Sequence, residues 1–209
     1  MTEHRAQRQT VAGNRMSPAR RGADTGAART KPTRAELAAA AGRCLPDRIG
    51  DDLQVLFCGI NPSLYSAAIG HHFARPGNRF WPTLYRAGFT DRLLTPQEDQ
   101  LLPRFGAGLT NLVERATARA DELSAEEIRR GTDQLLVKLR GYRPRCIAFL
   151  GIGAFRTAFA QPRAAPGRQR EPIDATTVWV LPNPSGLNAH YQIADLTALF
   201  AELRHAIRA

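Results

Sequence analysis

Short apolar runs separated by helical patterns constrain most strongly how this chain folds. The runs at residues 53–58, 145–150 and 176–181 are bounded by turn residues, as in strands that are buried on both faces of a sheet. A fourth strand is expected near residues 108–113. Strands that alternate with helices favour a parallel sheet between two helical layers. The sequence therefore predicts an α/β fold, a three-layer α/β/α sandwich whose central, mostly parallel sheet has about four strands.

Capping signals mark where helices should begin. Thr95 stands three residues before Glu98, and Ser124 stands three residues before Glu127, which is the spacing of a capping box. After Ser124, apolar residues recur at helical spacing and predict one buried face. Further helices are expected over residues 80–87 and 193–207.

Two Asn-Pro turns follow the first and the last of the apolar runs. They read Gly-Ile-Asn-Pro-Ser at residues 59–63 and Leu-Pro-Asn-Pro-Ser-Gly-Leu at residues 181–187. The proline after each asparagine holds that asparagine extended and stiffens the turn. Because an open parallel sheet binds its ligand outside the carboxyl ends of its strands, we expect the two turns to form one active site.

The N-terminal segment has few large apolar side chains and is rich in Arg, Ala, Gly, Thr and Pro. Because it buries too little surface to offset the entropy lost on ordering, residues 1–48 are expected to be a disordered basic tail and residues 49–209 the folded domain. Through Arg34 the chain has eight basic and two acidic residues, which makes +6 of its net +10. Three interpretations of the tail stay open. It is a solvated extension, or the start codon has been placed too early and Met16 is the true beginning, or it is a basic arm that raises non-specific affinity for nucleic acid.

No apolar run reaches the roughly 20 residues that a membrane span needs, and the N-terminal segment lacks the apolar core of a secretory signal. A soluble, cytoplasmic protein is expected, and the Arg-rich start leaves a transit peptide as an alternative. Three cysteines, at positions 44, 58 and 146, are too few and too scattered for a disulfide scaffold. Cys58 and Cys146 lie inside apolar runs and should be buried.

Two other motifs have alternative interpretations. The Gly-Ile-Gly stretch at residues 151–153 follows an apolar run as a dinucleotide-binding turn would, but Arg156 stands where the third glycine belongs. The pair His71 and His72 has no obvious Cys or carboxylate partner, so a structural role is favoured over metal binding.

The two Asn-Pro turns and the residues after the first of them closely resemble the mismatch-specific uracil and thymine DNA glycosylases, a branch of the uracil-DNA glycosylase superfamily. The resemblance rests on GINPSLYSAAIGHHFARPGNRFWPTLYRAGFTDR at residues 59–92 and on VLPNPSGLN at residues 180–188. It extends from about residue 51 to the C-terminus. It implies a monofunctional DNA glycosylase that flips uracil out of a G·U mispair and hydrolyses its N-glycosidic bond, which initiates base excision repair. Ethenocytosine is a further expected substrate, and thymine a poor one.

The resemblance assigns the catalytic role to Asn61, which would position the attacking water. Since an amide is a poor general base, bond breaking is expected to precede attack and to pass through a sugar cation. Backbone N–H groups near Ile60 and after Phe73 would stabilise the departing pyrimidine anion. Lys31 and Lys138 are the only lysines, and neither is near a turn, so Schiff-base chemistry and strand cleavage are not expected. The implied mechanism needs no metal or cofactor.

Other site residues follow from the same resemblance. Phe73 would stack on the flipped base, and Leu187 would wedge into the vacated stack. Gly186 would allow close backbone approach in that loop. The substrate-binding residues implied are Gly59, Ile60, Pro62, Ser63, Ser66, Phe73 and Asn183, and the DNA-binding residues implied are Ser185, Gly186, Leu187 and Asn188. Arg75 and Arg79 are expected either to contact phosphate or to be structural, and Asn78 and Trp81 to hold the loop.

The chain departs from the family pattern at two positions. The family often has glycine where this chain has Ser63, which would narrow the pocket or alter an N–H contact to the base. A wedge-flanking arginine of some relatives is Ala189 here, so recognition of the opposite base would be weaker. Ser66 lies where the pocket meets the pyrimidine 5-position in relatives, and its polar side chain would disfavour the methyl group of thymine.

Two rival functions stay open at this stage. A catalytically weak lesion-binding protein would have no need of Asn61, but Ser63 keeps that alternative open. An enzyme that uses a nucleotide cofactor at residues 151–153 would bind free dinucleotide and ignore DNA. The favoured partner is double-stranded DNA with a G·U or related mispair, bound by a monomeric bacterial enzyme that associates with the nucleoid through DNA.

Overall fold

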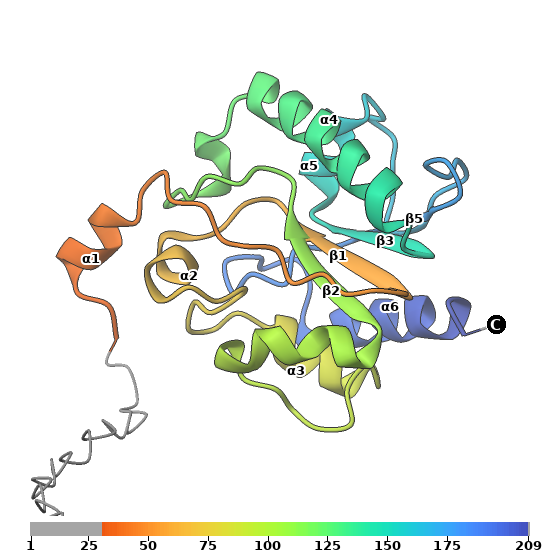
Figure 1. The fold of residues 1–209 in the computed structure, drawn as a ribbon, viewed down its shortest axis with the longest axis horizontal. Helices are drawn as coiled ribbons and strands as arrows, with labels where there is room; N and C mark the ends of the chain where they lie inside the picture. The colour runs from red at the N-terminus through yellow and green to blue at the C-terminus, as the bar shows by residue number, and fades with distance from the viewer. Residues whose placement is uncertain (1–30, 209) are drawn as a thin grey trace, which may run out of the picture. The chain divides into compact units, whose positions relative to one another are not determined.

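A sheet of five strands in the order β2-β1-β3-β5-β4 forms the centre of the structure, a computed structural model that describes residues 31–208 (Figure 1). The sheet is parallel except for β4, which pairs antiparallel with β5 at one edge. Its strands are Val55–Gly59 (β1), Ala107–Asn111 (β2), Cys146–Leu150 (β3), Gly167–Arg168 (β4) and Thr177–Leu181 (β5). The predicted mostly parallel sheet is confirmed, with five strands where about four are predicted. The extra strand, β4, is two residues long and has no apolar run to reveal it.

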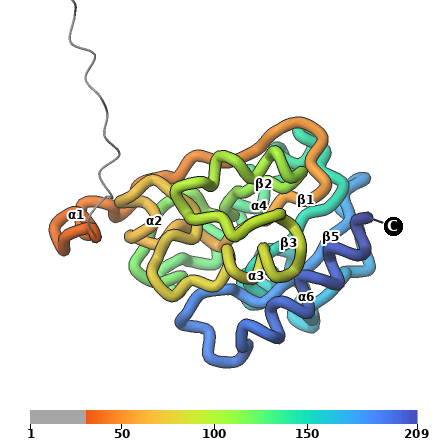
Figure 2. Tube along the Cα trace, turned by 90° about the horizontal axis from the view of Figure 1, so that it is seen from below, coloured from red at the N-terminus to blue at the C-terminus, as the bar shows by residue number. Residues whose placement is uncertain are grey.

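Helices cover both faces of this sheet and confirm the three-layer α/β/α architecture (Figures 1 and 2). The two helices α3 and α6 lie side by side on one face, together with the 3₁₀ helix η1. The opposite face is covered by α4 and α5. Their bounds are Phe80–Arg86 (α3), Pro96–Phe105 (η1), Ala125–Tyr142 (α4), Ile152–Ala158 (α5) and Ile193–Ala206 (α6).

Burial on both faces explains why the strands are apolar throughout. Along β1, Val55 and Phe57 pack into the core beneath α3 and α6, whereas Leu56 and Cys58 pack into the core beneath α4. Successive side chains of a strand alternate between its faces, so each residue meets a helical layer. Cys58 and Cys146 are buried as predicted, and this burial raises the pKa of both thiols, that of Cys146 to about 12.

The predicted capping signals are confirmed at two helix starts. The Ser124 hydroxyl accepts the N–H of Glu127 at 3.1 Å, and the Ser124 N–H donates to the Glu127 carboxylate at 3.0 Å, where α4 begins. Thr95 and Glu98 form a second capping box where η1 begins. The helices expected over residues 80–87 and 193–207 are α3 and α6. The short helices α1, α2 and α5 are not predicted, because one or two turns are too few to show a period.

The folded part of the chain begins earlier than the sequence predicts. Within the segment expected to be disordered, α1 (Arg34–Ala39) starts with a capping box between Thr33 and Glu36. The segment then packs Ala40 against Ala67 and Ala116, so close contact of small side chains replaces the large apolar residues that the composition lacks. The prediction of disorder is therefore wrong for residues 33–48, and residues 1–30 lie outside the described part. Between residues 31 and 208, no helix is long and apolar enough to cross a bilayer.

The strand order creates the place for a site. The chain leaves the interior strand β1 toward β2 on one side and later returns to β3 on its other side. Connections that diverge in this way leave a crevice outside the carboxyl ends of the strands, where open α/β sheets bind ligands. The first Asn-Pro turn begins at this point, and α2 (Leu64–Ile69) follows it.

Helix α4 approaches the chain after β2 so closely that it needs a glycine. A Cβ at Gly131 would lie 2.1 Å from the carbonyl oxygen of Leu112, whereas a Cβ at Gly141 of the same helix would have no atom within 4 Å. We predict that Gly131→Ala lowers the free energy of unfolding by about 3 kcal/mol, as overpacking of a core does. The control Gly141→Ala should leave stability unchanged or raise it by up to about 0.5 kcal/mol, since alanine favours helix. Denaturant unfolding of both variants checks this, and equal effects would contradict it.

Candidate active site

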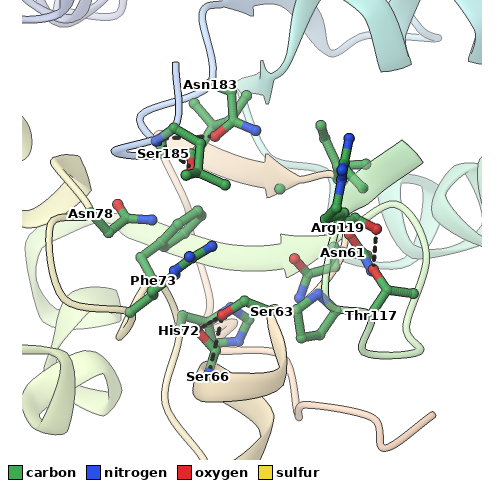
Figure 3. A pocket seen from close by; sticks show the side chains of 18 of the residues that line it. Asn61, Ser63, Ser66, His72, Phe73, Asn78, Thr117, Arg119, Asn183 and Ser185 are labelled. Atoms are coloured by element: carbon green, nitrogen blue, oxygen red, sulfur yellow. Dashed lines mark hydrogen bonds between the residues drawn. The ribbon is translucent and has the colours of Figure 1, made fainter. Parts of the chain in front are cut away.

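A cavity of about 380 Å³ lies at the carboxyl edge of the sheet (Figure 3). Each long parallel strand contributes to its lining: Gly59 ends β1, Asn111 ends β2, Leu150 ends β3 and Asn183 follows β5. The two Asn-Pro turns therefore meet at one cavity, although β3 lies between the strands that they follow. The predicted convergence of the turns is confirmed.

The cavity brings together the residues that the sequence predicts for the site, with one exception. Gly186 does not line it. The predicted residues that do are Gly59, Ile60, Asn61, Pro62, Ser63, Ser66, Phe73, Asn183, Ser185, Leu187 and Asn188. Figure 3 shows Asn61 and Thr117 on one side of the cavity and Phe73 on the opposite side.

The carboxamide of Asn61 is held in one orientation. Its Nδ2 donates to the carbonyl oxygen of Arg115 at 3.0 Å and to Oγ1 of Thr117 at 2.7 Å. The Thr117 hydroxyl itself donates to the carbonyl oxygen of Arg119 at 2.7 Å, so its remaining role toward Asn61 is that of an acceptor. Because both neighbours accept, the amide nitrogen must face them. No described residue uses Oδ1 of Asn61, which is therefore left as an acceptor for a ligand or water in the cavity.

Main-chain pairing holds the segment around Thr117 against the first turn. The Thr117 N–H donates to the carbonyl oxygen of Pro62 at 3.2 Å, and the Leu64 N–H donates to the carbonyl oxygen of Thr117 at 3.1 Å. The Arg115 side chain is anchored in turn by Glu127 of α4, at 2.5 Å and 3.2 Å. The Arg115 guanidinium holds the pKa of the Glu127 carboxyl at about 2, so this ion pair persists at neutral pH.

Phe73 combines a strained backbone with a packed ring. Its φ is +53°, in the left-handed region that side chains rarely adopt. The ring stacks on Phe80 with centroids 4.1 Å apart, and the residue also lines the cavity. Trp81 supports the same loop, since its Nε1–H donates to the carbonyl oxygen of His72 at 3.2 Å. This confirms the prediction that Trp81 holds the loop, and it leaves Phe73 positioned as an aromatic wall of the cavity.

Buried polar contacts explain the histidine pair. The fully buried Asp99 accepts the main-chain N–H of His72 at 3.0 Å and the Nε–H of Arg48 at 2.9 Å, and it lies 3.3 Å from Nδ1 of His71. Burial lowers the pKa of His72, so its ring is neutral at pH 7 and its Nε2–H donates to the carbonyl oxygen of Pro46 at 2.9 Å. The pair thus ties the Phe73 loop to η1 and to the segment before β1, which is the structural role that the sequence favours.

A chain of hydroxyl groups lines the cavity at the start of α2. Ser63 caps this helix by accepting the N–H of Ser66 at 3.1 Å, and its hydroxyl donates to Oγ of Ser66, also at 3.1 Å. Oγ of Ser66 accepts a second bond from the N–H of Ala74 at 3.1 Å. The proton of the Ser66 hydroxyl is consequently left without an acceptor among the described residues. It is available to a ligand in the cavity.

The loop of the second turn presents Leu187 at its tip. Leu187 is 67% exposed, as much as any large apolar side chain among the described residues. Asn188 faces inward, because its Nδ2 donates to the carbonyl oxygen of Asn183 at 2.9 Å and its Oδ1 accepts the N–H of His190 at 3.2 Å. The structure thus gives Asn188 a role within the loop, beside the DNA contact expected from the sequence.

The sequence analysis missed several residues that line the cavity, and three of them bear on its polar contacts. Asn111 is 7% exposed and lines the cavity, and no described residue hydrogen-bonds its carboxamide. A Cβ on Gly59 would lie 2.6 Å from Oδ1 of Asn111, so glycine is needed beside it. A polar residue that ends a predicted strand is a signal that would have found Asn111. Thr117 and Arg119 lie in an irregular segment between β2 and α4, where no sequence pattern singles them out.

Lys138 does not line the cavity. Lys138 pairs with Asp47 at 2.8 Å and with Glu114 at 3.1 Å. Burial by itself would lower the pKa of Lys138, but the hydrogen bonds and charges of these two acids outweigh it and raise the pKa. Its amine stays protonated at neutral pH and is unsuited to act as a nucleophile.

The glycine-rich turn after β3 serves packing. A Cβ at Gly151 would lie 2.9 Å from Cδ1 of Ile60, so the glycine allows the first Asn-Pro turn to sit against it. The space beside Gly151 measures about 10 Å³, far less than a nucleotide occupies. These contacts give Gly151 a structural role and offer no support for the cofactor alternative.

The fold and the sequence both match known proteins. The solution NMR structure of a candidate uracil DNA glycosylase from Methanosarcina acetivorans is similar to this chain, with a TM-score of 0.53 and 21% identity. The match covers 78% of this chain and 99% of that one, and it shows a shared fold. The model of the family described as the uracil DNA glycosylase superfamily matches residues 46–206, which include both turns and every predicted site residue. The chain therefore belongs to the uracil DNA glycosylase superfamily.

Proposed function

We propose that this protein is a monofunctional DNA glycosylase of the mismatch-specific branch, which flips uracil out of a G·U mispair and hydrolyses its N-glycosidic bond to initiate base excision repair. The observation that carries this proposal is the fixed carboxamide of Asn61, whose acceptor oxygen is free at the cavity. Action as a monomer is part of the proposal.

Asn61 is suited to holding a water molecule, not to removing its proton. Oδ1 can accept one hydrogen of the water and so direct its oxygen toward C1′ of a flipped nucleotide. Because an amide does not take up a proton at neutral pH, the C1′–N1 bond breaks first and its electron pair passes to N1 of the base. The water oxygen then bonds to C1′ of the sugar cation, and the proton that it releases balances the uracil anion.

The departing base needs hydrogen-bond donors, and the cavity offers them. The main-chain N–H groups of Ile60 and Phe73 have no partner among residues 31–208, and both residues line the cavity. Donors that are already in place stabilise developing negative charge at little reorganisation cost. The unpaired carboxamide of Asn111 supplies one donor and one acceptor, which complement a carbonyl group and the N3–H of uracil. Phe73 would stack on the base in that position.

Among residues 32–208 no amine lines the cavity, which supports simple hydrolysis over strand cleavage. Schiff-base chemistry requires an unprotonated amine next to C1′. Lys138 is held in ion pairs and does not line the cavity. The expected product is an abasic site in an intact strand.

The contacts of Ser63 give no particular support to the lesion-binding alternative. The Ser63 side chain is engaged by the cap of α2 and by Ser66, so the departure from glycine builds a hydroxyl chain along the wall of the cavity. The proton of Ser66 is then free to meet the base. We propose uracil as the best substrate, ethenocytosine as a further one and thymine as a poor one, because a polar hydroxyl disfavours contact with the thymine methyl group.

The proposed activity is tested by single-turnover excision from a labelled duplex with one G·U mispair, in chelator, followed by alkali. The wild type should give strand cleavage only after alkali. Asn61→Ala should lose about 100-fold in rate, the order of effect expected when a reactant is no longer positioned, while its affinity for G·U DNA is kept. Tight binding without cleavage by the wild type would instead support a lesion-binding protein.

Substrate choice gives a second prediction. The wild type should excise uracil from G·U at least about tenfold faster than thymine from G·T, and Ser66→Ala should narrow this ratio, because about 1.4 kcal/mol of discrimination corresponds to tenfold. Ser63→Ala is the matched control, since it removes the neighbouring hydroxyl and leaves that of Ser66 in place. Similar rates for the two bases in the wild type, or an unchanged ratio in Ser66→Ala, would refute the assignment.

A further inference from the structure

The second Asn-Pro turn continues into an irregular loop that one residue from elsewhere in the chain holds in place. We call residues 183–191 the wedge loop and residues 71–79 the stacking loop, since they carry Leu187 and Phe73. We propose that Arg79 is a positioning residue that fixes the wedge loop on the stacking loop, so that both loops engage DNA as one unit. This inference rests on the proposed function.

Arg79 satisfies carbonyl groups along the whole wedge loop. Its Nε–H donates to Pro184 at 3.4 Å, and one terminal nitrogen donates to Tyr191 at 2.5 Å. The other terminal nitrogen donates to Ser185 at 2.6 Å and to Asn188 at 2.9 Å. The main-chain N–H of Arg79 adds a bond of 2.9 Å to Pro184. These acceptors lie on both sides of Leu187, so the loop is fixed before and after its exposed tip.

A backbone contact joins the same two loops independently of this guanidinium. A Cβ on Gly186 would lie 2.6 Å from the carbonyl oxygen of Gly77 and 3.2 Å from its carbonyl carbon. Only glycine lets the chains approach this closely. The close approach that the sequence predicts at Gly186 is therefore made, within the described residues, to the stacking loop.

The hydrogen bonds of Arg79 also decide between the two roles that the sequence left open. Four of the five N–H bonds of a guanidinium are committed to carbonyl oxygens of the wedge loop. Among the described residues no carboxylate forms an ion pair with it. A guanidinium so occupied has little capacity left for a DNA phosphate. The contacts favour the structural role.

This arrangement has a consequence for base flipping. As Leu187 enters the stack that the base has left, Phe73 must already be placed to receive the base. A loop that is ordered before DNA binds need not lose conformational entropy during binding, which favours the flipped state. Rigid coupling of the two loops through Arg79 would supply this preorganisation.

The test compares two rates of uracil excision. One substrate is a duplex whose single G·U mispair is flanked by normal base pairs, and the other carries the uracil in a short unpaired bubble, where little unstacking is needed. Arg79→Met keeps the aliphatic stem and removes every side-chain bond to the wedge loop. It should slow excision from the duplex at least about tenfold more than excision from the bubble. In the Leu187→Ala background, Arg79→Met should add less than about twofold, since residues that act through one element are not additive.

Two further variants separate position from charge. Arg79→Lys keeps the charge but lacks the planar guanidinium. Gly186→Ala displaces the wedge loop and leaves Arg79 intact. Both variants should lose excision rate on the duplex, relative to the bubble, as Arg79→Met does. Thermal unfolding of each variant checks that it is folded. Three results would overturn the inference: a wild-type excision rate in Arg79→Lys, equal losses of rate on duplex and bubble in Arg79→Met, or additive losses of rate when Arg79→Met is combined with Leu187→Ala. A wild type that excises uracil from neither substrate would refute the proposed function itself.

Discussion

The orientation of the Asn61 carboxamide is the constraint on which the site depends. It is set by two acceptors, the carbonyl oxygen of Arg115 and the hydroxyl oxygen of Thr117. The hydroxyl cannot donate to Asn61, because its proton goes to the carbonyl oxygen of Arg119. An amide turned by 180° would place an oxygen against these acceptors and present a donor to the cavity, which would hold a water in the wrong sense. The chemistry thus rests on a short irregular segment that follows β2.

The fold keeps this segment in place by continuing the sheet beyond its strands. After β1 and β2 end, the segments that follow them stay paired by main-chain hydrogen bonds. Val113 donates to Ile60, and Thr117 donates to Pro62. The opposite wall of the cavity is held by Asp99, which joins the histidine pair to Arg48. Leu45 also lines the cavity, so the segment before β1 belongs to the site as well as to the fold. Rigid supports on both sides would leave the cavity preorganised for the flipped base that the proposed function requires.

Much of this architecture is predictable from the sequence, because its signals are local. Apolar runs reveal the parallel strands, capping boxes reveal α4 and η1, and the Asn-Pro turns reveal two walls of the cavity. What is missed depends on contacts between distant segments. The sequence does not show that Asn111 ends a strand beside Gly59, nor that Thr117 orients Asn61. The order of residues 33–48 is missed because an Ala-rich composition hides the close packing of Ala40 against Ala67 and Ala116.

The central claim, that Thr117 orients Asn61 toward the attacking water, is tested most directly by single-turnover excision from a G·U duplex by Thr117→Val and Thr117→Ser. Valine keeps the shape of threonine and removes the acceptor, whereas serine keeps the acceptor. We predict that Thr117→Val loses about tenfold in excision rate, the value of one hydrogen bond of about 1.4 kcal/mol, with unchanged affinity for the DNA, and that Thr117→Ser stays close to the wild type. Excision by Thr117→Val at the wild-type rate would contradict the account.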